Sequence, residues 1–224
     1  MTRAISSEML RLKLAESLAA PLPARTRRDL RLPGIPGKAL AVLGVRRGGK
    51  TSFLQHRMAE QLGGGARPGT HLLVSLEDER LVGISAEDLG WLLEEHRRVV
   101  PAVREEGART LYLDEVQVVS GWESLVRRLL DSHDTTVFVS GSSSRLLSSE
   151  VHTSLRGRSM EVLVHPFSFR EALRHAGREP TADWEELSPD ERASIDAELR
   201  RYLEVGGFPE AQEADPRDRM ALLK

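Results

Sequence analysis

The chain has 224 residues and contains no cysteine, which excludes disulfide bonds and metal sites built on thiolates. It also lacks any uninterrupted apolar stretch long enough to span a membrane. Charges such as Glu8, Arg11 and Lys13 are dispersed through the N-terminal region, which therefore lacks the apolar core of a signal peptide. We expect a cytoplasmic protein with no membrane partner.

A strong charge of either sign is missing as well. The formal net charge is −2, so bulk charge does not support DNA or another nucleic acid as a partner. The seven histidines show no metal-binding spacing, and the G-x-S-x-G pattern of serine hydrolases is absent. Residues 25–31 are basic; we expect a solvated linker there, with nucleic-acid contact as the alternative.

Residues 44–51, G-V-R-R-G-G-K-T, match the whole phosphate-binding loop pattern G-x-x-x-x-G-K-[ST]. A short apolar run at 39–43 suits a buried strand before the loop, and Leu54 and Met58 have helical spacing after it. In such a loop backbone N–H groups surround phosphates, and the following helix points its positive end at them. The alternative is a glycine-rich turn with an incidental lysine.

Apolar runs and helical stripes alternate along the chain, which predicts an α/β fold with a parallel sheet and right-handed crossovers. Helix starts are indicated at Ser85 and Ser188, and Trp122 is expected to anchor a core helix. We divide the chain into an N-terminal helix and linker, a nucleotide-binding core and a helical segment, at 1–37, 38–167 and 168–224. The expected strands are 39–43, 71–76, 110–113, 135–139 and 160–164.

An apolar strand at 111–113 ends in two carboxylates, Asp114 and Glu115. Beside a phosphate loop, Asp114 and Thr51 are expected to bind Mg2+, Glu115 to activate water as general base, and Lys50 to reach the terminal phosphates. The alternative is a polar strand end that meets solvent.

The next strand ends in a run of serines at 140–144. Because ligands bind at the carboxyl ends of parallel strands, Ser142, and after it Ser143, are candidates to sense the terminal phosphate. A plain turn or helix cap is the alternative. The full set expected to contact the nucleotide is Gly44, Arg46, Arg47, Gly48, Gly49, Lys50, Thr51, Ser52, Ser142 and Ser143.

Two arginines precede the last strand, in the stretch Leu155-Arg156-Gly157-Arg158. A guanidinium can stabilise charge on a transferring phosphoryl group, either within one chain or from a neighbouring subunit. Arg158 is the first candidate for this catalytic role and Arg156 the second. A solvated loop arginine is the alternative.

Six motifs in order resemble a family of AAA+-type P-loop ATPases of bacteria and archaea. The resemblance implies a P-loop NTPase three-layer sandwich with sheet order 5-1-4-3-2, and it supports Lys50, Thr51, Asp114 and Glu115 as site residues. Ser140 stands where the family usually has threonine. The motifs are G-V-R-R-G-G-K-T at 44–51, L-D-E-V-Q at 113–117, S-G-S-S at 140–143, L-R-G-R at 155–158, P-F-S-F-R-E at 166–171 and G-G-F-P-E at 206–210.

The resemblance also implies ATP as ligand, Mg2+ as cofactor and hydrolysis of the β–γ phosphoanhydride. Family members usually continue into a C-terminal domain, which we expect to be missing from a chain that stops at Lys224. That domain or a protein partner is then expected, and a homo-oligomer stays open. Two alternatives remain: a nucleotide-gated interaction module with little turnover, and a small-molecule kinase, against which Glu115 argues because it suits activated water.

Overall fold

The computed structural model describes residues 5–132, 134–141, 153, 155–215 and 217–219. Within these residues five parallel strands form one sheet in the order β2-β3-β4-β1-β5, which confirms the expected order 5-1-4-3-2. The strands are β1 (Ala39–Leu43), β2 (His71–Ser75), β3 (Arg109–Asp114), β4 (Thr135–Ser140) and β5 (Ser159–Leu163).

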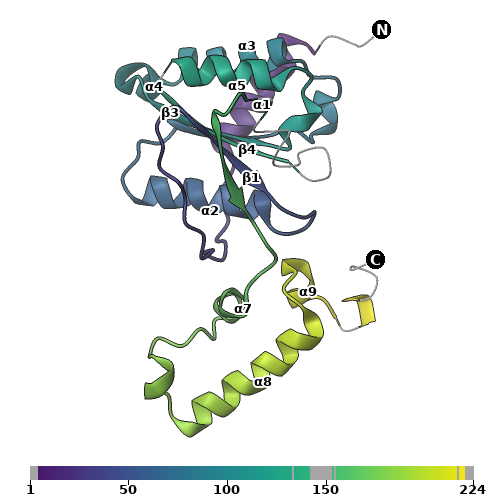
Figure 1. Cartoon of the computed structure of the whole chain (residues 1–224). Coiled ribbons are helices and arrows are strands. Elements are labelled where there is room, and N and C mark those ends of the chain that lie inside the picture. Colours follow the sequence, from purple (N-terminus) through teal and green to yellow (C-terminus); the bar gives the residue numbers. More distant parts are fainter. Residues whose placement is uncertain (1–4, 133, 142–152, 154, 216, 220–224) are drawn as a thin grey trace.

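Helices cover both faces of the sheet, so the fold is the expected three-layer α/β sandwich (Figure 1). One face carries α1 (Ser7–Ala19), α3 (Ala86–Val99) and α5 (Trp122–Asp131), and the other carries α2 (Lys50–Gly63). A short helix that the sequence analysis did not predict, α4 (Pro101–Glu106), follows α3; it begins at a proline and ends at Gly107 in the left-handed region.

The C-terminal part extends away from the sheet as a separate group of helices (Figure 1). It contains α7 (Phe169–His175), α8 (Pro189–Val205) and α9 (Pro209–Glu213). Capping boxes start both α7 and α8, from Ser168 and Ser188, where the serine hydroxyl and a glutamate three residues later each bind a backbone N–H. The sequence predicts a helical segment from residue 168 and a capping box at Ser188, but not the capping box at Ser168.

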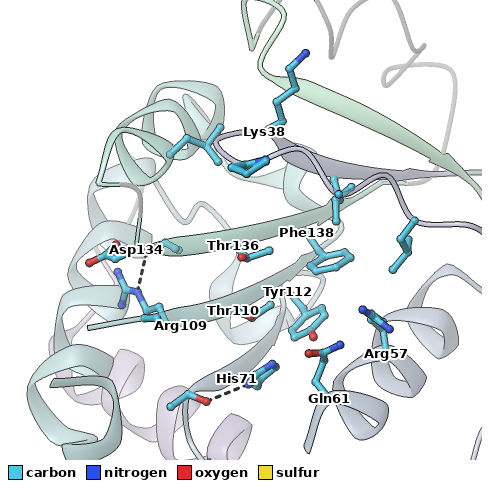
Figure 2. Close-up of a pocket in the computed structure, with 18 of the residues that line it drawn as sticks. Lys38, Arg57, Gln61, His71, Arg109, Thr110, Tyr112, Asp134, Thr136 and Phe138 are labelled. Carbon is cyan, nitrogen blue, oxygen red and sulfur yellow. Dashed lines mark hydrogen bonds between the residues drawn. The ribbon is translucent and has the colours of Figure 1, made fainter. Parts of the chain in front are cut away.

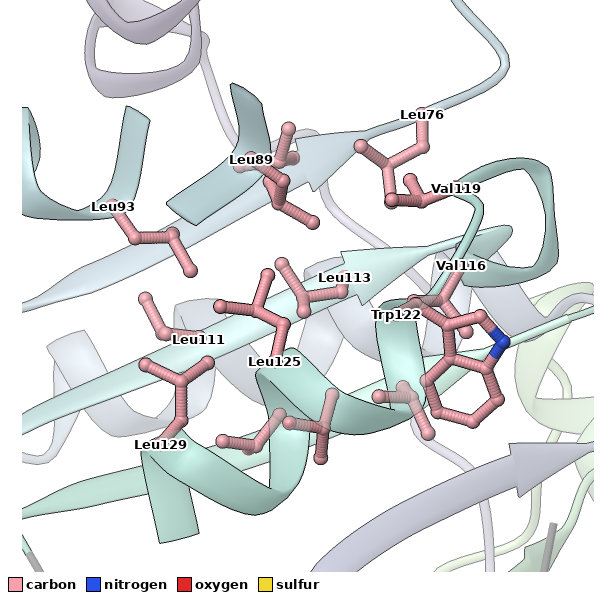
Figure 3. Packing of buried hydrophobic residues seen from close by; sticks show 14 of the residues in the cluster. Leu76, Leu89, Leu93, Leu111, Leu113, Val116, Val119, Trp122, Leu125 and Leu129 are labelled. Carbon is pink, nitrogen blue, oxygen red and sulfur yellow. The ribbon is translucent and has the colours of Figure 1, made fainter. Parts of the chain in front are cut away.

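Alternation along the strands divides the core into two hydrophobic clusters. Leu111 and Leu113 of β3 face α3 and α5, whereas Tyr112 between them faces α2. Figure 3 shows the first cluster, in which Trp122 and Leu125 of α5 pack toward β3. Trp122 is 5% exposed, so it is a core residue, as expected from its helical stripe.

A cavity of about 640 Å³ lies at the amino ends of the strands, beside α2 and the segment that leads into β1. The Tyr112 ring at its floor stacks on Phe138, with ring centroids 4.8 Å apart (Figure 2). The Tyr112 hydroxyl is buried and has no hydrogen-bond partner in the described part of the chain. Burial also raises the pKa of Tyr112, so the hydroxyl stays neutral.

This unpaired hydroxyl gives a stability prediction. Tyr112→Phe should raise the free energy of unfolding by about 1 kcal/mol, because it removes a buried polar group that folding leaves unsatisfied. Urea denaturation at pH 7 measures the change. The matched control is Tyr202→Phe, which removes a hydroxyl that donates to the Phe167 carbonyl oxygen at 2.7 Å and should lower stability instead. Equal losses in both variants would contradict the prediction.

Candidate functional site

The phosphate-binding loop runs from the carboxyl end of β1 to the amino end of α2. Gly44 opens it with φ +153°, and a Cβ at this position would lie 2.1 Å from the carbonyl oxygen of Val164, just beyond β5. Glycine is therefore required where the backbone after β5 crosses the start of the loop. Arg47, in the middle of the loop, is one of three described non-glycine residues with positive φ, at +61°.

Lys50 begins α2 and is 5% exposed. Its Nζ donates to the carbonyl oxygens of Gly44, at 3.2 Å, and Val45, at 3.1 Å. Burial lowers the pKa of Lys50, and the nearby charges of Glu115 and Asp114 oppose this shift. The ammonium group therefore lies over the mouth of its own loop, where bound phosphates would replace carbonyl oxygens as its partners.

Asp114, at the end of β3, connects the loop to the strands. The Thr51 hydroxyl of α2 donates to Asp114 Oδ2 at 2.7 Å, and the Ser140 hydroxyl of β4 donates to Asp114 Oδ1. Asp114 is 2% exposed. Burial raises the pKa of its carboxyl, and the hydrogen bonds from Ser140 and Thr51 offset only part of that shift. The carboxylate and the Thr51 hydroxyl are both hard oxygen ligands, which fits Mg2+.

Glu115 follows directly and is also buried, at 8% exposed. Its backbone lies in the left-handed region, with φ +57°, a conformation that costs a residue with a side chain roughly 1–2 kcal/mol. The Glu115 N–H donates to Ser140 Oγ at 3.1 Å, and the Gln117 side-chain amide donates to Glu115 Oε2 at 2.6 Å. Ser140 and Gln117 thus hold the backbone and the carboxylate of Glu115.

The structure therefore brings together Lys50, Thr51, Asp114 and Glu115, which the sequence analysis assigned to one site. Ser142 and Ser143 lie outside the described residues. Their neighbour Ser140, which the sequence analysis did not select, is the hydroxyl that the structure places on the acidic pair. Its position at the end of β4, next to β3 in the sheet, was the available signal.

Arg158 lies at the opposite end of the sheet. Its carbonyl oxygen accepts the N–H of Ala39, at the amino end of β1, whereas the loop follows the carboxyl end of that five-residue strand, roughly 16 Å away at 3.3 Å per residue. Its side chain pairs with Asp131. Neither Arg158 nor Arg156, two residues before it, is brought to the loop of its own chain.

The basic stretch at 25–31 is not a solvated linker throughout, so that expectation is wrong at Arg28. Arg28 is 9% and Glu171 4% exposed, and Arg28 Nε donates to Glu171 Oε1 at 2.9 Å. The guanidinium also donates to the carbonyl oxygens of Gly48, at 3.3 Å, and His165, and it lies 4.9 Å from the Phe167 ring centroid. One arginine thus joins the N-terminal linker, the phosphate loop and α7.

The C-terminal helices contact the segment after β5 and the phosphate loop through the G-G-F-P-E motif at 206–210. The Phe167 N–H donates to the Gly207 carbonyl oxygen at 2.6 Å, and a Cβ on Gly207 would lie 2.2 Å from the Phe167 carbonyl oxygen. Only glycine fits this close backbone crossing. Two residues on, α9 begins, and its Glu210 forms an ion pair with Arg47 of the loop at 3.5 Å.

A cavity of about 610 Å³ opens between the linker, the first turn of α2 and the C-terminal helices. Its size suits a small-molecule ligand. Apolar surface comes from Phe53 and Phe167, and charged groups surround it. The lining includes Arg28, Gly49, Ser52, Arg174, His175 and Glu210. This cavity adjoins the phosphate loop, unlike the one beneath Tyr112.

P-loop NTPases are defined by a phosphate-binding loop between a strand and a helix, with an aspartate at the end of another strand. The fold and the site of this chain have these features and place it in that class. A family model described as AAA domain matches residues 36–173. The chain belongs to that family, and its core is accordingly a nucleotide-binding domain of the AAA type.

Two curated relatives are uncharacterized proteins. One, from Methanocaldococcus jannaschii, is 35% identical over 183 residues, which are 82% of this chain and 38% of that protein. The other, from Haemophilus influenzae, is 33% identical over 178 residues, or 78% of this chain and 40% of that protein. The chain thus spans about two fifths of the length of these relatives.

Solved structures of low identity are also similar. Caenorhabditis elegans PCH-2 has a TM-score of 0.44 at 12% identity, with 96% of this chain and 58% of that chain covered. AMPPCP-bound DnaA from Aquifex aeolicus has a TM-score of 0.41 at 16% identity, with 99% and 63% covered. No helix in the described residues is long and apolar enough to cross a membrane.

The buried Arg28–Glu171 pair predicts a pH dependence of stability. Burial of Glu171 raises its pKa, but hydrogen bonds from Arg28, Ser168 and Asp29 outweigh this and lower the pKa below 4.5. A carboxyl group whose pKa is lower in the folded state stabilises the fold at pH values above its unfolded pKa of 4.5. This stabilisation is lost as the pH falls through the folded pKa.

Glu171→Gln should therefore be less stable than the unsubstituted chain at pH 7, by about 2 kcal/mol for lost hydrogen bonds to a charged group. The difference should shrink as pH falls below 4.5. Urea denaturation across pH 3–7 measures it. Glu191→Gln is the control, because Glu191 makes the same capping contacts without an arginine, and its effect should be smaller. A pH-independent difference at Glu171 would contradict the interpretation.

Proposed function

We propose that this chain binds Mg-ATP on the loop at 44–51 and hydrolyses the β–γ phosphoanhydride. The observation that carries the proposal is the 2.7 Å hydrogen bond from Thr51 to Asp114, which joins the phosphate loop to a carboxylate pair that includes a buried Glu115. Family membership supports nucleotide binding by the core.

Each part of the nucleotide has a group suited to it. The phosphates lie against the loop, where Lys50 exchanges its carbonyl partners for phosphate oxygens. The base and ribose enter the cavity of about 610 Å³ beside Phe53 and Phe167, with Ser52 at its edge. Thr51 and Asp114 hold Mg2+, which would neutralise charge on the phosphates.

The reaction proposed is attack by water on the terminal phosphorus. The water oxygen bonds to the terminal phosphorus while Glu115 accepts a proton from the water. At the same time the bond between the terminal phosphorus and the β–γ bridging oxygen breaks. Lys50 stabilises the negative charge on the transferring group. A kinase would present a hydroxyl acceptor instead of water, and the adjacent Glu115 makes that alternative the weaker one.

Two substitutions separate binding from hydrolysis. Lys50→Ala should weaken ATP binding about 10- to 100-fold, because it removes a charge-assisted contact with phosphate. Glu115→Gln should bind ATP with unchanged affinity and hydrolyse it about 10²- to 10⁴-fold more slowly. Equilibrium titration with ATP and a phosphate-release assay measure these effects. Lys38→Ala, at the far end of β1, is the control and should match the unsubstituted chain; equal phosphate release by all four proteins would refute hydrolysis at this site.

The arginines suggest how subunits could cooperate. Because Arg158 lies at the opposite sheet end from its own loop, it could reach only the site of a neighbouring copy, so activity would depend on self-association. A monomeric chain would then behave as the nucleotide-gated module with little turnover. We also propose that a protein partner or a further domain acts together with this chain, whose ATPase core spans residues 38–167.

A mixing experiment tests this arrangement. Arg158→Ala should lower hydrolysis at least about tenfold, since an arginine supplied in trans contributes strongly to phosphoryl transfer. Mixing it with Lys50→Ala, which binds ATP weakly but retains Arg158, should restore part of the activity. Mass in solution with and without ATP checks assembly. Full activity of Arg158→Ala, or no recovery in the mixture, would contradict a role in trans, and Arg156→Ala serves as the comparison.

A further inference from the structure

Gln117 lies two residues beyond Glu115, in the short 3-10 helix η2 (Val116–Val118) that follows β3. Its side chain turns back, and Nε2 donates to Glu115 Oε2 at 2.6 Å. Charge fixes the orientation of the carboxamide, because the opposite orientation would set an amide oxygen against a carboxylate oxygen. The contact therefore restrains the carboxylate that we propose as general base.

The turn that carries Gln117 has two unfavourable features. Glu115 adopts a left-handed backbone with φ +57°, and Gln117 Oε1 is buried with no hydrogen-bond partner in the described part of the chain. Both features cost free energy. Such costs persist where the surrounding structure imposes them, and they concentrate at functional sites.

The surrounding core imposes this geometry. Val116 is 0% and Val119 1% exposed, and both pack in the cluster shown in Figure 3 beside Trp122. These residues flank Gln117 and fix the turn at either side. The Glu115 N–H is held by Ser140. The backbone of Glu115 is thus held on both sides, and the hydrogen bond from Gln117 restrains its side chain.

We propose that Gln117 is a positioning residue for hydrolysis, holding the Glu115 carboxylate toward the attacking water while its own Oε1 accepts a hydrogen bond from that water. The inference rests on the proposed ATPase function. It adds a second side chain to the water-activating group and gives the buried Oε1 the donor it lacks. The proton is still accepted by Glu115, so Gln117 changes the orientation and not the chemistry of the step.

The test is steady-state hydrolysis of Mg-ATP by Gln117→Ala and by the isosteric Gln117→Glu, which removes the amide donor without leaving a cavity. Both should lower kcat about 10- to 100-fold and leave KM within about twofold. ATP affinity by titration should be unchanged. Val118→Ala is the matched control, because Val118 lies in the same turn and is 43% exposed; its kcat should equal that of the unsubstituted chain.

A double substitution distinguishes positioning from a structural role. If Gln117 and Glu115 act on the same water as one unit, Gln117→Ala should lower kcat much less in a Glu115→Gln background than in the unsubstituted chain. Independent, multiplicative losses would overturn the proposal, as would an unchanged kcat in Gln117→Ala when the unsubstituted chain turns over. Absence of turnover in the unsubstituted chain with ATP bound would instead overturn the proposed function, and this inference with it.

Discussion

The Asp114 carboxylate is the point on which the nucleotide site depends. It receives hydroxyl hydrogen bonds from Thr51 of α2 and Ser140 of β4, so three elements of the sandwich meet at one buried group. Ser140 also accepts the N–H of Glu115, which fixes the neighbouring carboxylate. A charge this deeply buried is stable only with such partners, and the same partners define where a cation and its phosphates would lie.

A second set of contacts gathers parts of the chain that are distant in sequence around the loop. Arg28 precedes the sheet and Glu171 follows it, 143 positions after Arg28 in the chain. Arg28 also donates to the Gly48 carbonyl oxygen. Glu210 of α9 pairs with Arg47 of the same loop. This exposed pair contributes little energy in water, so the buried Arg28–Glu171 pair is the stronger connection between loop and helices.

Local signals in the sequence were enough for much of this architecture. The apolar strands, the loop at 44–51 and the Asp114–Glu115 pair follow from periodicity and motif, and the sheet order followed from a resemblance to a family. Burial of Arg28 could not be predicted, because its partner Glu171 is remote in the chain and a basic stretch is usually solvated. The contact of Gln117 with Glu115 depends on the left-handed backbone of Glu115, which its residue type does not predict.

The segment at 164–167 is crossed closely by the backbone of a glycine at each of its ends. Gly44 leaves room for the Val164 carbonyl oxygen, and Gly207 leaves room for that of Phe167. Insertion or deletion of a single residue between these two crossings would move one carbonyl out of register with its glycine. In chains that keep both glycines, the number of residues in this segment is therefore fixed, whereas the exposed turn around Gly65 can vary in length.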